Sequence, residues 1–309
     1  MLPSTAPLSA WALWCCCSGA LWACAGAEAK PLDGRKVQGT VKLLWPIHFS
    51  SVPLSRPGPN SLEPPELGQK LAALGLERFQ HYVRSTLPHE LAVDPDLAEE
   101  FNRTDHSRVN IAFRRWQMRV FADQERIPVE ELTARGELAP QLPGINYSWP
   151  ELYGSREFKK LKVRISELSR LYIKRTGYDH IPAKFRIFVW VEVYGRGDAL
   201  RPNSRTDGAY LMGRYWASAK KGSLKLNFED PRGINPPYGK THSYSVYEGN
   251  VVLYPSWVSQ FITPNMHDRT AVSYCFLVYP QDGNTLDWED DLTGRLEVVK
   301  PLMSNGPGG

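Results

Sequence analysis

An arginine and a serine late in the chain have the types and the spacing to hold a carboxylate. Arg269 opens the apolar run RTAVSYCFLVY, and Ser273 follows four residues later. Side chains four residues apart on an extended strand lie on the same face. A guanidinium that faces inward there can hold a carboxylate through two parallel hydrogen bonds. The other interpretation is an ion pair between Arg269 and Asp268 or another acid at the strand end, and the residues by themselves favour that pair.

Histidine and cysteine usage shows no clear metal site or nucleophile. None of the seven histidines begins a His-x-Asp or His-x-Glu triplet, and His242 and His267 are predicted to be loop or surface residues. Cys275 lies in an apolar run without a base nearby, so a buried structural thiol is predicted. The chain has no Walker-type phosphate loop, dinucleotide fingerprint or Cys-x-x-Cys pair. The tripeptide Arg196-Gly197-Asp198 is typical of a turn after a strand.

The second half of the chain has the period of strands. The segment FRIFVWVEV (185–193) has a period of two. One face would carry Phe185, Ile187, Val189, Val191 and Val193, and the other Arg186, Phe188, Trp190 and Glu192. Because both sets are largely apolar, the pattern predicts a strand covered on both faces. Short strands separated by Gly, Pro and Asp signals predict a double-sheet jelly roll or barrel. The further predicted strands are 208–217, 223–229, 242–248, 250–255, 259–263, 269–279 and 295–300.

The first half is predicted to be mainly helical and to support the strands. Apolar residues recur at helical spacing over 66–86 and again over 156–175, where Gly177 is the expected helix end. A strand is predicted over 39–49, and the less regular region 95–155 is predicted to cap one end of the barrel. The predicted division is a leader at 1–27, a support region at 28–182, a barrel core at 183–300 and a tail at 301–309.

Residues 8–27 form an uncharged apolar block that ends in small residues and holds four of the five cysteines. A signal peptide is the preferred interpretation, which predicts the secretory pathway or an extracellular location and no stable membrane association after cleavage. The rival interpretation is a membrane anchor through 8–27, because the block is near the minimum spanning length of roughly 17 residues. The leader contains no basic residue, since Lys30 is the first one in the chain.

Charge gives little reason to expect a nucleic-acid partner. The chain of 309 residues has 37 basic and 33 acidic residues, a formal net charge of +4. The densest basic cluster falls on the predicted helix 156–175, where a solvated helix face is the simpler explanation. That cluster consists of Lys159, Lys160, Lys162 and Arg164.

Residues 198–279 contain an ordered series of landmarks. In order and spacing this series resembles the 2-oxoglutarate and Fe(II)-dependent oxygenases, in particular the group related to prolyl hydroxylases. The resemblance implies an α+β, mainly β fold, a double-stranded β-helix (jelly roll) with N-terminal helices packed on one sheet. It also implies 2-oxoglutarate and Fe(II) as cofactors. The landmarks are Asp207-Gly208-Ala209-Tyr210, the segment 222–232, Glu248-Gly249-Asn250, Tyr254-Pro255-Ser256-Trp257 and Arg269.

The metal ligands that the resemblance implies are two imidazoles and a carboxylate on one face. The corresponding positions hold Ala199, Arg201 and Gln260. Alanine has no donor atom, arginine carries a permanent positive charge that repels Fe(II), and a glutamine amide is a weak substitute for imidazole. Asp198 is a weak alternative ligand, because a lone carboxylate would still have no histidine partner.

The cosubstrate half of the implied site is better preserved. The resemblance places Tyr210 and Arg269 where the remote carboxylate of 2-oxoglutarate binds, with Ser273 on the same face as Arg269. Two hypotheses follow, and they leave open whether the protein is an enzyme. The first is a hydroxylase that acts on a protein or small-molecule substrate. The second is a pseudoenzyme that serves as a binding or scaffolding domain, in which Arg201 and Arg269 form a metal-free anion pocket.

Overall fold

The computed structural model describes residues 40–44, 47–101, 107–125, 142–176, 182, 184–204, 209–233 and 239–280. The predicted leader, the predicted helix end at Gly177, the strand at 295–300 and the tail lie outside these residues. No helix among the described residues is long and apolar enough to cross a membrane.

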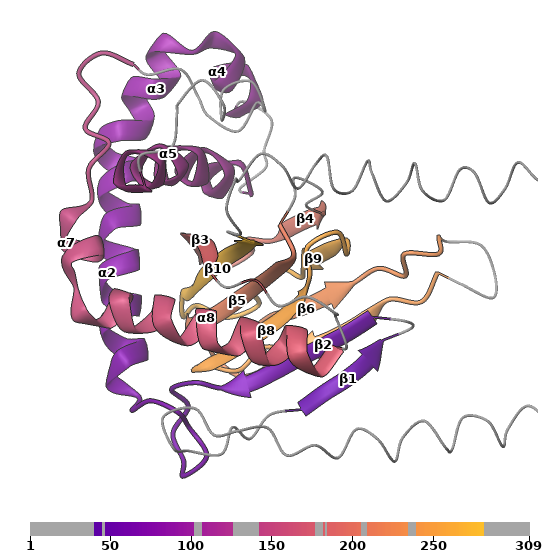
Figure 1. Ribbon diagram of the computed structural model, residues 1–309. Coiled ribbons are helices and arrows are strands. Elements are labelled where there is room, and N and C mark those ends of the chain that lie inside the picture. Colours follow the sequence, from indigo (N-terminus) through magenta and orange to yellow (C-terminus); the bar gives the residue numbers. More distant parts are fainter. Residues whose placement is uncertain are drawn as a thin grey trace, which may run out of the picture.

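The larger of two antiparallel sheets combines strands from both halves of the chain (Figure 1). β10 lies between β3 and β5, and the pair β1 and β2 extends the sheet beyond β8. The predicted strand over 39–49 is therefore two antiparallel strands. In spatial order the strands are β1 (Thr40–Leu44), β2 (Ile47–Pro53), β8 (Asn250–Pro255), β5 (Leu211–Ser218), β10 (Ala271–Pro280) and β3 (Phe185–Tyr194).

The smaller sheet lies against the inner face of the larger one. The ring centroid of Phe228, on the smaller sheet, lies 5.3 Å from that of Phe49 and 4.7 Å from that of Tyr254, both on the larger sheet. Side chains of the two sheets therefore interdigitate. From β3 to β10 the chain crosses repeatedly between the sheets, and among the strands that the structure describes in this span only β6 and β7 are consecutive in one sheet. The smaller sheet has the order β4 (Leu200–Asn203), β9 (Gln260–Ile262), β6 (Lys225–Phe228) and β7 (His242–Ser245).

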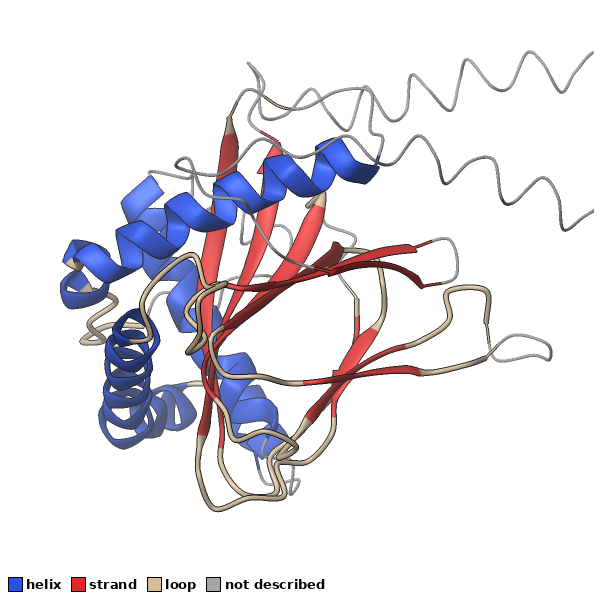
Figure 2. Cartoon of the chain, turned by 90° about the horizontal axis from the view of Figure 1, so that it is seen from below, coloured by secondary structure: helices blue, strands red, loops and turns tan. Residues whose placement is uncertain are grey.

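Helices cover the outer face of the larger sheet, and Figure 2 shows them gathered on one side of the strands. Gly68 and Gly75 on α2 lie close to side chains of the sheet, and Tyr274 of β10 donates a hydrogen bond to the Leu71 carbonyl. The result is a mixed α+β fold with more strands than helices among the described residues. The helices are α2 (Glu66–His81), the π-helical turn η2 (Tyr82–Thr86), α3 (Leu87–Val93), α4 (Pro95–Phe101), α5 (Ser107–Glu125), α7 (Pro150–Gly154) and α8 (Arg156–Thr176).

The region 95–155 is more helical than predicted, because α5 occupies its centre. This helix carries buried polar side chains that hide its apolar period, including Asn110 and Gln117. Both amides bind the backbone of β3, the last strand of the larger sheet. Asn110 hydrogen bonds with the N–H and the C=O of Val193, and Gln117 does the same with Val191. The helix therefore pairs with the open edge of β3.

The basic cluster on α8 is only partly a solvated face. Arg164 is buried and donates to Glu63 at 2.8 Å and to Glu167 at 2.7 Å. Lys160 also pairs with Glu63. The contacts with Glu63 hold α8 against the segment that links β2 to α2.

Candidate functional site

The space between the two sheets contains a charged pair that the alternation of the strands directs inward. On β3 the side chains of Phe188, Trp190 and Tyr194 belong to the inner apolar core, and Glu192 shares their face. On β5 the inward residues are Met212, Arg214 and Trp216, and on β10 they include Ser273 and Cys275. One acid and one base therefore lie on the inner faces of apolar strands.

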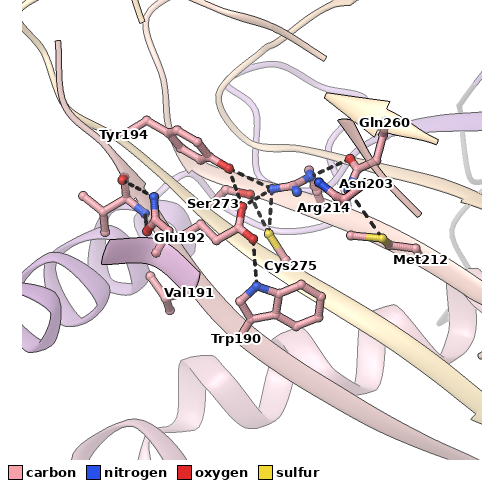
Figure 3. Close-up of polar contacts among 12 residues, drawn as sticks. Trp190, Val191, Glu192, Tyr194, Asn203, Met212, Arg214, Gln260, Ser273 and Cys275 are labelled. Atoms are coloured by element: carbon pink, nitrogen blue, oxygen red, sulfur yellow. Dashed lines mark hydrogen bonds and ion pairs between the residues drawn. The ribbon is translucent and has the colours of Figure 1, made fainter. Parts of the chain in front are cut away.

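Arg214 and Glu192 form an ion pair between the two sheets (Figure 3). Arg214 Nη1 donates to Glu192 Oε2 at 2.5 Å, and their side chains are 0% and 7% exposed. Trp190 Nε1 donates to Glu192 Oε1 at 2.9 Å, and the Tyr194 hydroxyl donates to Oε2. Both carboxylate oxygens thus accept hydrogen bonds, which offsets part of the cost of burying the charge.

The surroundings keep this pair charged. Burial acts to raise the pKa of Glu192, but the charge of Arg214 and hydrogen bonds from Arg214, Tyr194 and Trp190 outweigh it and lower the pKa below its ordinary value. Burial raises the pKa of Cys275 far above its ordinary value, in spite of the neighbouring Arg214. Cys275 is therefore a buried neutral thiol, whose sulfur lies 2.8 Å from Arg214 Nη1.

Gln260 connects the pair to the opposite sheet. Its side-chain oxygen accepts from Arg214 Nε at 3.2 Å and from the Tyr254 hydroxyl at 2.7 Å. Its nitrogen donates to Asn203 Oδ1 at 3.3 Å and lies 3.5 Å from Met212 Sδ. Gln260 is fully buried, so the residue at the expected distal ligand position lies between the sheets, where it is hydrogen bonded to a guanidinium.

The other two expected ligand positions lie on or beside β4. Ala199 is half-buried, and Arg201 is exposed. Asp198, the weak alternative, accepts a hydrogen bond from Gly195 N at 2.7 Å and so shapes the turn after β3. His267 lies on a loop and accepts from Arg269 N at 3.0 Å. Within the described residues, no three His, Cys, Asp or Glu side chains form a group that could hold a metal ion.

These residues do not fit Fe(II). A tight site needs imidazole and carboxylate donors with free lone pairs. The Gln260 oxygen already accepts two hydrogen bonds, and the carboxylate of Glu192 is bound by Arg214, Trp190 and Tyr194. A guanidinium beside both groups adds a permanent positive charge that opposes a dication.

The predicted cosubstrate residues are not brought together. Tyr210 N donates to the carbonyl of Val278, near the end of β10, whereas Arg269 precedes the start of the same strand. About nine residues of strand separate these places, which is roughly 30 Å. Arg269 is 52% exposed at its side chain and donates to Glu248 at 2.7 Å and to Ser218 at 3.1 Å.

Of the three predicted cosubstrate residues, Ser273 is the one that shares the interior with Arg214. It is fully buried, and its hydroxyl lies 3.6 Å from the Cys275 sulfur. Arg214 and Glu192 were not predicted as site residues. In the sequence, each of them is recognisable as the single charged residue on the inward face of a strand whose other inward residues are apolar.

No protein-family model matches this chain, and no curated protein matches it. Solved structures do. A prolyl-4-hydroxylase from Pseudomonas putida is 16% identical with a TM-score of 0.32, over 52% of this chain and 83% of that one. A 2OG-Fe(II) oxygenase family oxidoreductase from Burkholderia pseudomallei is 9% identical with a TM-score of 0.31, over 47% of this chain and 64% of that one.

A third similar structure is EvdO2 from Micromonospora carbonacea var. aurantiaca, solved with 2-oxoglutarate. It is 14% identical with a TM-score of 0.31, over 45% of this chain and 65% of that one. The Burkholderia structure is thus a 2OG-Fe(II) oxygenase family member, and the EvdO2 structure contains 2-oxoglutarate. At these identities and TM-scores the likeness assigns no role to any residue of this chain.

Proposed function

We infer that this protein is a non-catalytic counterpart of the 2-oxoglutarate and Fe(II)-dependent oxygenases, a barrel that serves as a binding or protein-interaction domain. One observation carries the proposal. Gln260, where the resemblance expects the distal iron ligand, is hydrogen bonded to the buried cation of Arg214. An ion pair therefore holds the interior together at the place where an oxygenase needs open metal positions.

The strand order supports a double-stranded β-helix as the fold behind this proposal. Strands β3, β5, β8 and β10 lie in the larger sheet, and β4, β6, β7 and β9 lie in the smaller one. Eight antiparallel strands divided between two facing sheets are typical of a jelly roll. The barrel remains, and the residues inside it have a structural role.

Chemistry at the expected ligand positions supports the loss of catalysis. Ala199 has no donor, Arg201 is exposed and charged, and both side-chain ends of Gln260 are engaged. Restoring a metal site would require new side chains as well as removal of the Arg214 charge. This separates the proposal from that of a hydroxylase with 2-oxoglutarate as cosubstrate.

An anaerobic titration with Fe(II) and 2-oxoglutarate tests the proposal. The expected result is no metal-to-ligand charge-transfer band, and no decarboxylation of 2-oxoglutarate when oxygen is then admitted. A band in the unaltered protein would return it to the hydroxylase hypothesis.

A variant with restored ligands is the matched control. Ala199→His, Arg201→Asp and Gln260→His supply two imidazoles and a carboxylate, and Arg214→Met with Glu192→Leu removes the ion pair without leaving one charge buried. A band in this variant alone assigns the loss of iron binding to these five positions.

A further inference from the structure

Two donor nitrogens between the sheets have no hydrogen-bond acceptor among the residues that the structure describes. They are Nη2 of Arg214 and Nε1 of Trp216, and both side chains are fully buried. Buried polar groups in native proteins almost always have partners, and leaving one unpaired destabilises the fold. Two such donors in one space therefore call for a group that accepts hydrogen bonds.

The two donors lie in the same part of the barrel. Arg214 and Trp216 are two residues apart on β5 and share its inner face. Tyr194 lies beside both, since its hydroxyl is 3.4 Å from Arg214 Nη1 and its ring centroid is 6.2 Å from that of Trp216. Ser273 pairs in register with Trp216 on one side and with Glu192 on the other. This short side chain lies between much larger neighbours.

The chemistry of the neighbours favours an anion over water. Arginine and tryptophan side chains only donate, so their partner must accept without needing to donate in return. The nearby acceptors are already used: both oxygens of Glu192 and the oxygen of Gln260 receive hydrogen bonds. A small anion satisfies both donors, whereas a water would bring two protons of its own.

We propose that the barrel interior binds one small monovalent anion, of the size of a halide or formate, through Arg214 Nη2 and Trp216 Nε1 with the Ser273 hydroxyl beside it. The surrounding side chains are fully buried, which limits the ligand to a few atoms. This site deepens the proposed function and rests on it, because it requires a guanidinium inside the barrel in place of iron. It also differs from a pocket formed by Arg201 and Arg269, which lie on the surface.

Thermal unfolding of the full chain at constant ionic strength tests the site, with chloride, bromide, formate or 2-oxoglutarate replacing gluconate. The small anions are expected to raise Tm by roughly 5–10 °C at one hundred times their dissociation constant. Gluconate and 2-oxoglutarate are expected to give no such rise because of their size. A response to 2-oxoglutarate alone would overturn the proposed ligand class, and equal Tm values in all salts would mean that water occupies the donors.

Trp216→Phe removes one free donor and leaves the Arg214–Glu192 pair in place, so it is expected to lose most of the anion response. Trp190→Phe is the matched control, since the Trp190 N–H already donates to Glu192 and the response should remain. Equal responses in both variants would contradict the site. Should Trp216→Phe fail to fold, crystals of the unaltered protein grown in bromide decide the matter. An anomalous peak within hydrogen-bond distance of both nitrogens supports the site, and its absence refutes it.

These measurements contain no iron, so they test the anion site separately from the proposed loss of catalysis. Loss of the anion response without a charge-transfer band would leave the non-catalytic proposal standing. A charge-transfer band would remove the proposed function together with the anion site.

Discussion

Arg214 and Glu192 carry opposite charges and are both buried, and the cost of burying a charge decides what each substitution does. Removing an ion from water costs several kcal/mol, and the partner and hydrogen bonds must offset this. The carboxylate of Glu192 accepts hydrogen bonds from three side chains, which stabilise its negative charge. A buried pair of this kind is weak evidence for added stability, but a single charge left behind is strongly unfavourable.

Arg214→Met is therefore expected to lower the free energy of unfolding by about 3–5 kcal/mol, because it leaves the Glu192 charge unpaired. Glu192→Leu should have a similar effect, and the double variant should lose much less than the sum of the two. Urea unfolding of the four proteins forms a double-mutant cycle that measures this coupling.

Arg196→Met is a suitable control for that cycle, since its ion pair with Asp268 is 73% and 81% exposed at the two side chains. Exposed pairs contribute little, so the unfolding midpoint should hardly change. Additive losses at Arg214 and Glu192 would show that the two charges do not depend on each other.

At the level of elements, the contact of α5 with β3 determines how the larger sheet ends. Asn110 and Gln117 are seven residues apart, which is about two helical turns, so they lie on one face of α5. Each amide pairs with both backbone groups of one β3 residue. A helix thus supplies the hydrogen bonds that a further strand would make.

Gln117→Ala should leave the N–H and the C=O of Val191 without partners. At about 1–3 kcal/mol for each buried group, the expected loss of stability is about 2–6 kcal/mol. Hydrogen exchange at the Val191 amide should accelerate along with it, as measured on the folded protein. Asp123→Ala, an exposed change on the same helix, should alter neither quantity. An unchanged exchange rate at Val191 in Gln117→Ala would mean that the helix does not protect this edge.

The elements with a clear period were predictable from the sequence. The alternation over 185–193 predicted β3, and the apolar spacing over 156–175 predicted α8. The helix α5 was not predicted, because tertiary pairing buries Asn110 and Gln117 on what would otherwise be an apolar face. A polar residue that binds the backbone of another element looks, in the sequence, like an exposed one.

The candidate site was only partly predictable, for a related reason. The position of Gln260 could be counted from its neighbours in the chain, but its hydrogen bond with Arg214 was not predicted. The pairing of Arg214 with Glu192 depends on β10 lying between their strands, in a register that brings Cys275 opposite both Arg214 and Trp190. Two lone charges in apolar strands indicate that each needs a partner, but only the strand order shows that they are partners of each other.

At the scale of the whole molecule, buried tyrosines in both apolar cores make the stability of the fold depend on pH. Tyr82, Tyr215 and Tyr274 belong to the core between helices and sheet, and Tyr194 and Tyr254 to the core between the sheets. Burial is the main cause that raises the pKa of every one of them above its ordinary value. Both cores therefore resist the ionisation of the same kind of group.

These shifts predict unfolding at alkaline pH. A tyrosine whose pKa is raised in the folded state keeps its proton there, while the unfolded chain releases it near pH 10. The stability that this difference contributes is complete below about pH 10 and is lost as the pH rises further toward the folded-state pKa values. The free energy of unfolding in urea should thus fall steeply above about pH 10, with tyrosinate absorbance from these residues increasing only as the chain unfolds. Tyr215→Phe should make the fall less steep, since one fewer proton is released on unfolding, and a stability that stays constant up to about pH 12 would contradict the buried state of these tyrosines.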